Sequence, residues 1–484
     1  MMATLLPVSI SILSSILKKH DCEVMLFDTT YYKTEEISFE QKKAQLLQVR
    51  KFNMSEAGIN QKRTDLYDDL KKIMKEFGPD LVGSTMVEDV QDLAISMFKT
   101  IKENFDVPLI VGGIYGNFAF EKILNCGYVD MLCLGEGEGA IVDVVDRLKD
   151  GKDYTDIKNL CFIRDGKLVK NCLRPLVDIN DLPFIDFDIF EPSRLGRAMH
   201  GKVFKMLHVE IDRGCPYNCT YCAAPSLKKM YAANNCGNYF RQKRSGRIID
   251  EMIYLKDKYQ PNYIDFNAES FLARDINELK DFAVRYKTKI GLPFWCQSRT
   301  ETVTEEKISV LKDMGCTDLQ FGIEHGNEEF RKRVLNRHQS NGGMLKALKI
   351  VEKYGIPYSV NNIIGFPNET RELMFDTIEF NRLINPKTMN CYILTPYSGT
   401  PIRDYCVDNG LLDRDAKTEQ LLDGADIKNP YVNRNELKGI QRTFSLYARL
   451  PKDRWPEIKL AESFDARGET AFEKLTEEFH NKFF

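Results

Sequence analysis

The chain has 484 residues, 43% of them hydrophobic and 29% charged, which allows about three globular domains at ~150 residues each. Sixty-eight Lys and Arg residues oppose 71 Asp and Glu residues, and this near balance, without a long basic run, argues against a dedicated nucleic-acid-binding protein. No stretch approaches the ~20 consecutive apolar residues of a membrane span, so we expect no transmembrane segment.

Thirteen cysteines stand in a chain that shows no secretory signal. The apolar run at residues 5–17 lacks a basic leading segment and a small-residue cleavage site, and it continues into Lys18 and Lys19, so it predicts a helix. We therefore expect a cytoplasmic protein. Thiols stay reduced in that compartment, where clustered cysteines indicate a metal or catalytic site rather than disulfides.

Residues 1–145 alternate short apolar runs with helical periodicity. Near-continuous apolar runs are typical of parallel strands covered on both faces. Such strands are expected at 23–28, 81–85, 109–113 and 131–135, and helices at Leu66–Phe77 and Val90–Phe105. The pattern predicts a doubly wound, Rossmann-like α/β domain, whose ligands bind at the carboxyl ends of the strands.

Small residues follow three of these expected strands. They are Gly83, Ser84 and Thr85, then Gly112 and Gly113, then Gly135, Glu136 and Gly137. Small side chains let a bulky ligand approach the backbone closely. The alternative, that glycines simply end the strands, stays open on these residues alone.

The remaining chain divides into three parts. Residues 146–199 hold a hairpin around Asp165-Gly166 and an irregular linker at 181–186. Residues 200–410 repeat a strand–helix pattern, and residues 411–484 are charged with the spacing of short helices. The second strand series is expected at 207–212, 263–267, 293–297, 318–323, 358–365 and 390–395. Six parallel strands predict a partial (β/α)6 barrel, with its chemistry on the loops at the carboxyl ends of the strands.

Three cysteines carry the most specific signal. Cys215, Cys219 and Cys222 form a C-x3-C-x2-C motif directly after the first strand of the second series. Three thiolates on one loop can converge on a metal centre and leave one coordination position open for chemistry. The alternative is a zinc site, but zinc sites of structural type close with four ligands, and Cys236 is the only nearby candidate for a fourth.

This motif, with Tyr221 before its last cysteine, resembles the signature of the radical S-adenosylmethionine (radical SAM) superfamily. The resemblance implies that Cys215, Cys219 and Cys222 hold a [4Fe-4S] cluster whose remaining iron is chelated by SAM. One-electron reduction then gives a 5'-deoxyadenosyl radical that abstracts hydrogen. The cofactors supply this chemistry, and the protein positions and shields it.

The resemblance extends to residues at the ends of later strands. It implies a SAM site made by Tyr221, Asn267, Glu269, Arg299, Glu324 and Gly365. Arg299 and Glu324 are candidates for the charged methionyl end, because a carboxylate pairs with a guanidinium fork and an ammonium with an acid. An ordinary ion pair inside the barrel is the alternative for these two. His325 stands where family members usually carry Ser.

The order of domains resembles the cobalamin-binding radical SAM family, called class B methylases where methyl groups are transferred. The resemblance covers residues 1–410, with local matches at 111–113, 134–138 and 397–401. It implies that cobalamin lies on the small strand-end residues of the first domain. Two features depart from the family: the strand that usually precedes the first helix is shortened or missing, and His20 is the only histidine before residue 200, outside any D-x-H-x-x-G motif. Loss of cobalamin binding is therefore the alternative.

The resemblance implies methylation of an unactivated carbon, or less often of a phosphinate, through methylcobalamin. Cyclisation or rearrangement with the same cofactors is one alternative, and a non-catalytic metal-binding protein that retained the fold is another. A small-molecule substrate and an electron donor such as flavodoxin or ferredoxin are the expected partners. No further catalytic residue is identified. His208 is interpreted as a core or hydrogen-bonding residue, and Arg241–Arg247 as a solvated helix start.

Overall fold

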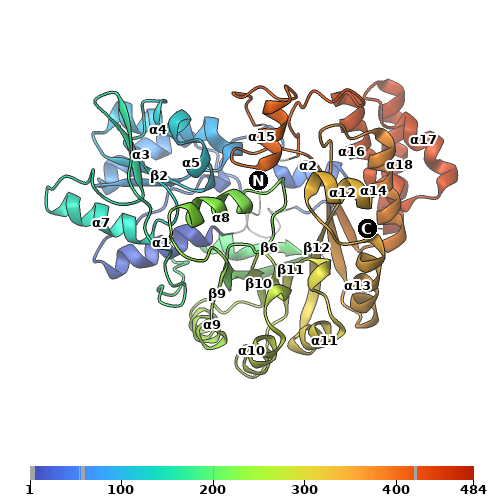
Figure 1. Cartoon of the computed structure of the whole chain (residues 1–484), viewed down its shortest axis with the longest axis horizontal. Helices are drawn as coiled ribbons and strands as arrows, with labels where there is room; N and C mark the ends of the chain where they lie inside the picture. The colour runs from blue at the N-terminus through green and yellow to red at the C-terminus, as the bar shows by residue number, and fades with distance from the viewer. Residues whose placement is uncertain (1–5, 54, 56–59, 200, 419–421, 484) are drawn as a thin grey trace.

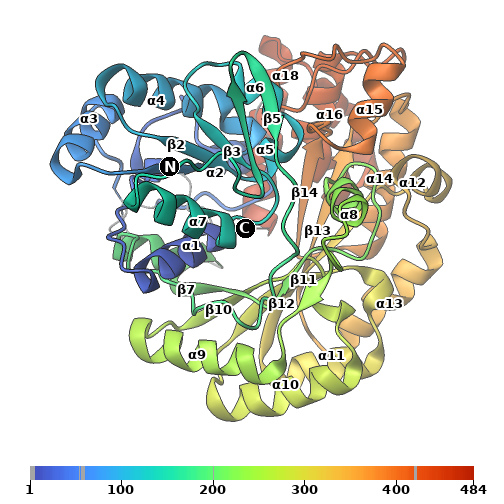
Figure 2. The same cartoon turned by 60° about the vertical axis from the view of Figure 1, so that its left-hand side comes forward.

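The computed structural model describes residues 6–53, 55, 60–199, 201–418 and 422–483. Two α/β units lie beside each other (Figure 1), the first coloured blue to teal and the second green to orange. Helices α9, α10, α11 and α13 of the second unit follow the convex side of its curled sheet, which Figure 2 shows from a second direction. Throughout the described ranges, every helix is too short or too polar to cross a lipid bilayer.

The first unit is a five-stranded sheet with helices. Its elements are α1 (Val8–Lys19), η1 (Thr29–Tyr31), α2 (Phe39–Gln45), α3 (Leu66–Phe77), β1 (Val82–Thr85), η3 (Glu88–Val90), α4 (Gln91–Asn104), β2 (Leu109–Gly112), α5 (Ile114–Phe118), α6 (Phe120–Leu124), β3 (Met131–Cys133), α7 (Glu138–Lys149), β4 (Leu160–Arg164) and β5 (Lys167–Lys170). The strand order is β1-β2-β3-β4-β5. The pairs β1–β2 and β2–β3 are parallel, whereas β3–β4 and β4–β5 are antiparallel.

Local sequence explains where these elements begin and end. Asp65 caps α3 by accepting hydrogen bonds from the backbone N–H groups of Tyr67 and Asp68, and Gly78 ends it in the left-handed conformation. The hairpin turns at Asp165-Gly166 as predicted. It extends the first sheet rather than linking the two units, because Cys161 and Leu160 pair with β3.

The expected first strand at 23–28 is wrong: no strand forms there. Leu26 packs against the core of the second unit, and Phe27 packs against the core of the first. The apolar side chains of this segment therefore pack between the two units instead of forming a strand. As a result, β1 is the edge strand of the first sheet.

The second unit is a half barrel. Its elements are η4 (Pro192–Leu195), β6 (Gly196–Met199), β7 (Lys202–Glu210), β8 (Asp212–Arg213), α8 (Ala224–Ala233), β9 (Arg241–Gln242), α9 (Ser245–Tyr259), β10 (Tyr263–Asn267), η5 (Phe271–Ala273), α10 (Ile276–Lys289), β11 (Phe294–Ser298), η6 (Thr300–Thr302), α11 (Glu305–Met314), β12 (Cys316–Glu324), α12 (Glu328–Leu335), α13 (Asn341–Lys353), β13 (Tyr358–Ile364), α14 (Arg371–Ile384), β14 (Thr388–Ile393) and α15 (Pro401–Asp408). The sheet order is β14-β13-β12-β11-β10-β7-β6.

All six predicted parallel strands of this unit are present. The sequence missed β6, a four-residue strand that pairs antiparallel with β7 at one edge. The convex face of the sheet is apolar: Val209, Phe266 and Phe321 belong to one core shared with the surrounding helices. The concave face carries polar side chains such as His208 and Asp265, as expected for a barrel that encloses a site.

The C-terminal region is helical, as predicted. It contains α16 (Arg434–Arg449), η7 (Lys452–Arg454), α17 (Trp455–Leu460) and α18 (Ala466–Phe483). Ile440 and Phe444 of α16 belong to the core of the half barrel. Leu475 of α18 joins the same core, so this region completes the outer layer of the barrel.

Candidate active site

The cysteine loop begins with a glycine that no other residue can replace without displacement. Gly214 has a φ of +86°, and an added Cβ would lie 2.3 Å from the carbonyl oxygen of Tyr239. The end of α12 anchors the loop, because Thr220 donates hydrogen bonds to the carbonyl oxygens of Val334 and Leu335. The loop is therefore held from both sides at the carboxyl end of the barrel strands.

The three predicted cysteines lie together on this loop. Cys219 is buried, and Cys215 and Cys222 are half-buried. Burial raises the pKa of the Cys215 thiol to about 11 and that of Cys222 to about 12. Among the described residues, no three His, Cys, Asp or Glu side chains are grouped as ligands of a single metal ion.

Arg299 lies against this loop. Its Nη1 is 3.2 Å from the sulfur of Cys219, and its guanidinium stacks 3.8 Å from the centroid of the Tyr217 ring. Glu301 holds the other side of the guanidinium at 2.5 Å. Sequence reasoning identified Arg299 but missed Glu301, whose role depends on the turn at η6.

Glu324 forms a buried ion pair that the sequence did not reveal. Its Oε1 is 3.0 Å from Nη1 of Arg337, which also donates to the hydroxyl of Tyr221 at 3.2 Å. Glu324 adopts a φ of +66° where the register of β12 shifts. An added Cβ on Gly322 would lie 2.1 Å from Oε1 of Glu324, so the glycine makes room for the carboxylate. Burial raises the pKa of Glu324, although the charge of Arg337 opposes this shift.

The predicted site residues at the end of β10 are Asn267, its last residue, and Glu269, which follows it. Asn267 and Glu269 are exposed at the carboxyl end of this strand. Burial by the surrounding protein nevertheless raises the pKa of Glu269. The charge of Glu269 also raises the pKa of Cys222, so this carboxylate acts on the cysteine loop.

Gly365 is buried against the C-terminal region. It has a φ of +82°, and an added Cβ would lie 2.8 Å from Leu437. Glu369 accepts hydrogen bonds from the N–H groups of Gly365 and Phe366, and it lies 2.9 Å from Nε2 of His325. The N–H of Asn327 donates to Nδ1 of His325, so the neutral ring carries its proton on Nε2 and donates it to Glu369. His325, which stands where family members usually carry Ser, thus links the segment after β12 to the segment after β13 through Glu369.

The small residues of the first unit gather at the carboxyl ends of β1, β2 and β3. Thr85 pairs with Gly112 in adjacent strands, and Gly83 and Thr85 are exposed. Gly113 has a φ of +99°, and an added Cβ would lie 2.6 Å from the carbonyl oxygen of Met86. The structure brings these residues to one edge of the sheet, as the sequence predicted.

The carboxylate of Glu136 forms hydrogen bonds with arginines of the second unit. Its carboxylate accepts from Arg213 at 3.1 Å, from Arg241 on both oxygens, and from the N–H of Val177. Arg213 also pairs with Glu138 at 2.6 Å. These pairs join the β3–α7 loop to the residue just before the cysteine loop, so the carboxyl ends of both sheets face each other.

The helix start interpreted at Arg241–Arg247 is present, since α9 begins at Ser245, but the interpretation of this stretch as solvated is wrong at Arg241 and Lys243. Arg241 pairs with Glu136 across the two units, and Lys243 is only 1% exposed and pairs with Glu251 at 2.9 Å. Glu136 lies 105 residues away from Arg241, so local charge patterning did not reveal that pair, whereas Glu251 lies 8 residues after Lys243 on α9.

A second contact between the units lies beyond β14. Glu88 accepts hydrogen bonds from the N–H and the hydroxyl of Ser398, at 2.7 and 3.0 Å. Tyr397 donates to Asp89 at 3.0 Å. Gly399 packs so closely that an added Cβ would lie 2.1 Å from the ring of Phe118.

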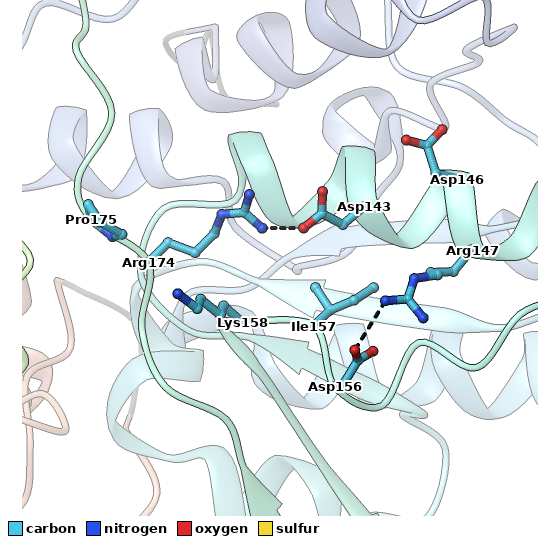
Figure 3. A pocket seen from close by; sticks show the side chains of 8 residues that line it. All are labelled: Asp143, Asp146, Arg147, Asp156, Ile157, Lys158, Arg174 and Pro175. Carbon is cyan, nitrogen blue, oxygen red and sulfur yellow. Dashed lines mark hydrogen bonds and ion pairs between the residues drawn. The ribbon is translucent and has the colours of Figure 1, made fainter.

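A separate pocket of about 520 Å³ lies beside α7 (Figure 3). Ion pairs of Arg174 with Asp143 and of Arg147 with Asp156 cross its lining. None of the predicted site residues lines it.

Comparisons with known proteins agree with this architecture. Residues 209–380 match the radical SAM superfamily. An uncharacterised methyltransferase of Pyrococcus horikoshii is 30% identical over 353 residues, which are 72% of this chain and 73% of that protein. The chain belongs to the radical SAM superfamily. An anaerobic magnesium-protoporphyrin IX monomethyl ester cyclase of Rubrivivax gelatinosus is 22% identical and covers 68% of this chain, which spans 59% of that protein.

Two solved structures share the fold. The radical SAM methyltransferase TsrM of Kitasatospora setae, solved with cobalamin and a [4Fe-4S] cluster, gives a TM-score of 0.63 at 18% identity, over 84% of this chain and 73% of that one. The cobalamin-dependent SAM radical enzyme OxsB, solved with aqua-cobalamin and SAM, gives 0.68 at 15% identity, over 99% of this chain and 69% of that one. The predicted combination of a Rossmann-like domain, a partial barrel and a helical end is confirmed.

Proposed function

We propose that this chain is a cobalamin-dependent radical SAM enzyme that methylates an unactivated carbon or phosphinate centre of a small molecule. The observation that carries the proposal is the position of Arg299 against Cys219, on a loop that faces the strand ends of a Rossmann-like unit. The TsrM and OxsB structures, which share this fold, contain cobalamin.

The donor set fits a cluster with one open iron. Cys215, Cys219 and Cys222 supply three thiolates, and the nearby Arg299 offsets their negative charge. When bound, the cluster and SAM supply the 5'-deoxyadenosyl radical, and cobalamin supplies the methyl group. An external one-electron donor such as flavodoxin or ferredoxin belongs to this proposal.

The chain's own residues would bind and orient SAM. Asn267 ends β10 and Glu269 follows it, both with exposed side chains, and Tyr221 accepts a hydrogen bond from Arg337. Glu324 contributes through its ion pair with Arg337, and Gly365 contributes through the backbone turn that Glu369 holds.

The small strand-end residues of the first unit would bind cobalamin. Gly83, Ser84, Thr85, Gly112 and Gly113 leave the edge of the sheet free of bulky side chains. Gly135, Glu136 and Gly137 contribute backbone only, because the Glu136 carboxylate is held by two arginines. His20 pairs with Asp146 at 2.6 Å on the surface, so the site has no histidine from this residue.

The test is a product assay. Protein prepared anaerobically with cobalamin is incubated with SAM and a reductant, and S-adenosylhomocysteine and 5'-deoxyadenosine are measured. The proposal predicts both products, and their loss in Cys219→Ala but not in Cys172→Ala, which replaces an exposed cysteine. The absence of both products from the intact protein would contradict it.

A cyclisation or rearrangement is the second candidate function, and the cyclase relative favours it. This candidate predicts 5'-deoxyadenosine without S-adenosylhomocysteine. The same assay therefore separates the two functions.

A further inference from the structure

The concave face of the half barrel contains a polar cluster below the cysteine loop. His208 on β7 and Asp265 on β10 are cross-strand neighbours. In the register of the next strand pair, Asp265 lies opposite Trp295 on β11. Each lies on the cavity face, about one layer of side chains below Glu210 and Asn267 at the strand ends. The cluster is therefore beneath the candidate SAM site rather than part of it.

Two hydrogen-bond donors in this cluster lack an acceptor. Nη1 of Arg197 and Nε1 of Trp295 are buried without a hydrogen-bond partner among the described residues. The guanidinium of Arg197 lies 5.5 Å from the centroid of the Trp295 ring, so the two donors are adjacent. Buried donors without partners destabilise a protein unless a ligand satisfies them.

The carboxylate nearest to these donors is already engaged. Asp265 is 2.5 Å from Nδ1 of His208, and both side chains are buried. Nη1 of Arg197 lies 3.7 Å from Asp265, beyond hydrogen-bond distance. The Asp265 carboxylate thus fixes the ring of His208 and forms an ion pair with Arg197, but it leaves the Nη1 donor of Arg197 without a hydrogen-bond acceptor.

A second cation approaches from the first unit. Burial and the charge of Arg197 lower the pKa of Lys43 on α2, while Glu40 opposes that shift. Neighbouring cations repel, and an anion bound near them relieves the repulsion.

Segment 39–48 closes the open side of the half barrel. The charge of Arg197 on the edge strand β6 acts on Lys43, and Gln48 donates to the carbonyl oxygen of Cys391 on the opposite edge strand β14 at 2.9 Å. Along the concave face, Asn361 accepts from Gln320 at 3.3 Å and from Asn390 at 2.8 Å. Polar side chains therefore continue along the concave face from β12 to β14.

We propose that Arg197 and Trp295 form a substrate subsite for an anionic group, a carboxylate or a phosphate, at the base of the half barrel. The subsite rests on the proposed function, since it would hold the substrate's charged end while the other end reaches the cysteine loop. The substrate class is therefore a small molecule with one terminal oxyanion group.

The test uses ¹⁹F NMR of the full chain, prepared anaerobically with its cluster and labelled with 5-fluorotryptophan. The two tryptophans give two resonances, which a Trp455→Phe variant assigns. Inorganic phosphate and acetate are titrated separately at constant ionic strength. We expect a saturable shift of the Trp295 resonance with at least one anion, while the resonance of Trp455 stays fixed and reports that the fold is intact.

Matched variants locate the effect. Arg197→Gln should weaken the anion's affinity at least tenfold, Arg197→Lys should weaken it less, and Arg285→Gln, which removes an exposed arginine of α10, should leave it unchanged. A stronger response to phosphate assigns a phosphate ester, and a stronger response to acetate assigns a carboxylate. No saturable shift with either anion, or an equal shift in Arg197→Gln, overturns the subsite.

This outcome is separable from that of the proposed function. Formation of 5'-deoxyadenosine on the same preparations reports the cluster chemistry without the subsite. Cluster chemistry without anion binding overturns only the subsite, whereas anion binding without SAM cleavage supports the subsite and overturns the proposed function.

Discussion

The guanidinium of Arg299 donates to the sulfur of Cys219 over 3.2 Å, while its other edge is held by Glu301. A charged donor beside a cluster ligand is well placed to pair with an anionic cofactor group.

We expect Arg299→Gln to slow 5'-deoxyadenosine formation about tenfold to a hundredfold, because a charge-assisted hydrogen bond contributes ~1.5–3 kcal/mol. Iron content should stay near that of the wild type, since the three cysteines are intact. Arg285→Gln serves as the control, because Arg285 is an exposed arginine paired on its own helix. Iron lost in proportion to activity would show instead that Arg299 holds the cluster.

Gly399 lies where the two units are in close contact, so a larger residue there should disturb their interface. An added Cβ would meet the Phe118 ring at 2.1 Å, and the residue has a φ of +79°. Gly410 has a similar φ of +68° with no atom within 4 Å of an added Cβ. Both alanine variants carry the conformational cost of ~1–2 kcal/mol, but only Gly399→Ala also disturbs the interface. We expect a larger fall in melting temperature and faster proteolysis for Gly399→Ala, and equal effects of the two variants would contradict the docking.

The ion pairs of Glu136 should contribute to the stability of the contact between the two units. Burial alone would raise the pKa of Glu136, but its hydrogen bond with Arg241 and the charges of Arg213 and Arg241 outweigh burial and lower it. A lowered pKa means that this stabilisation is present above the usual value of 4.5 and is lost as pH falls through the lowered one.

Glu136→Gln should therefore destabilise the protein at neutral pH by about 2–4 kcal/mol, because it leaves buried arginines without their carboxylate. The loss should shrink as the pH falls below 4.5. Thermal unfolding against pH measures this effect, with the exposed Glu103→Gln as the control. A variant as stable as the control at pH 7 would show that the ion pairs contribute nothing.

Asp89 should give the stability of the protein a pH dependence opposite in sign to that of Glu136. Burial raises its pKa from 3.8 to about 6, against the hydrogen bond from Tyr397. The folded protein thus keeps a proton that the unfolded chain releases, so stability falls as the pH rises from 3.8 to about 6.

Asp89→Asn should remove this fall. Its gain in stability should grow across that window and stay constant above it, at no more than about 3 kcal/mol. Melting temperatures measured against pH test this, with Asp92→Asn as the control because the side chain of Asp92 is 72% exposed. A gain that is equal at pH 4 and pH 7 would contradict the buried carboxyl.

Hydrophobic periodicity predicted most of the fold. The six parallel strands of the half barrel and the turn at Asp165-Gly166 follow from patterns within a few residues. β6 was missed because its four residues, Gly-Arg-Ala-Met, are too few to show such a pattern. The strand expected at 23–28 failed because Leu26 and Phe27 pack into different cores, which only the tertiary structure shows.

The candidate site was predicted unevenly for a similar reason. The cysteines and Arg299 follow strands, so their meeting at one end of the barrel was foreseeable. Arg337 and Arg241 were missed because their partners, Glu324 and Glu136, lie 13 and 105 residues away on other elements. No local pattern encodes such pairs.

The iron and sulfide content of the full chain, prepared anaerobically, tests the central claim most directly. The account predicts about four iron and four sulfide per chain, which is the stoichiometry of one [4Fe-4S] cluster. Both should be lost in Cys219→Ala and retained in Cys172→Ala. Zinc in place of iron, or iron that survives in Cys219→Ala, would contradict the assignment of Cys215, Cys219 and Cys222 as the cluster ligands.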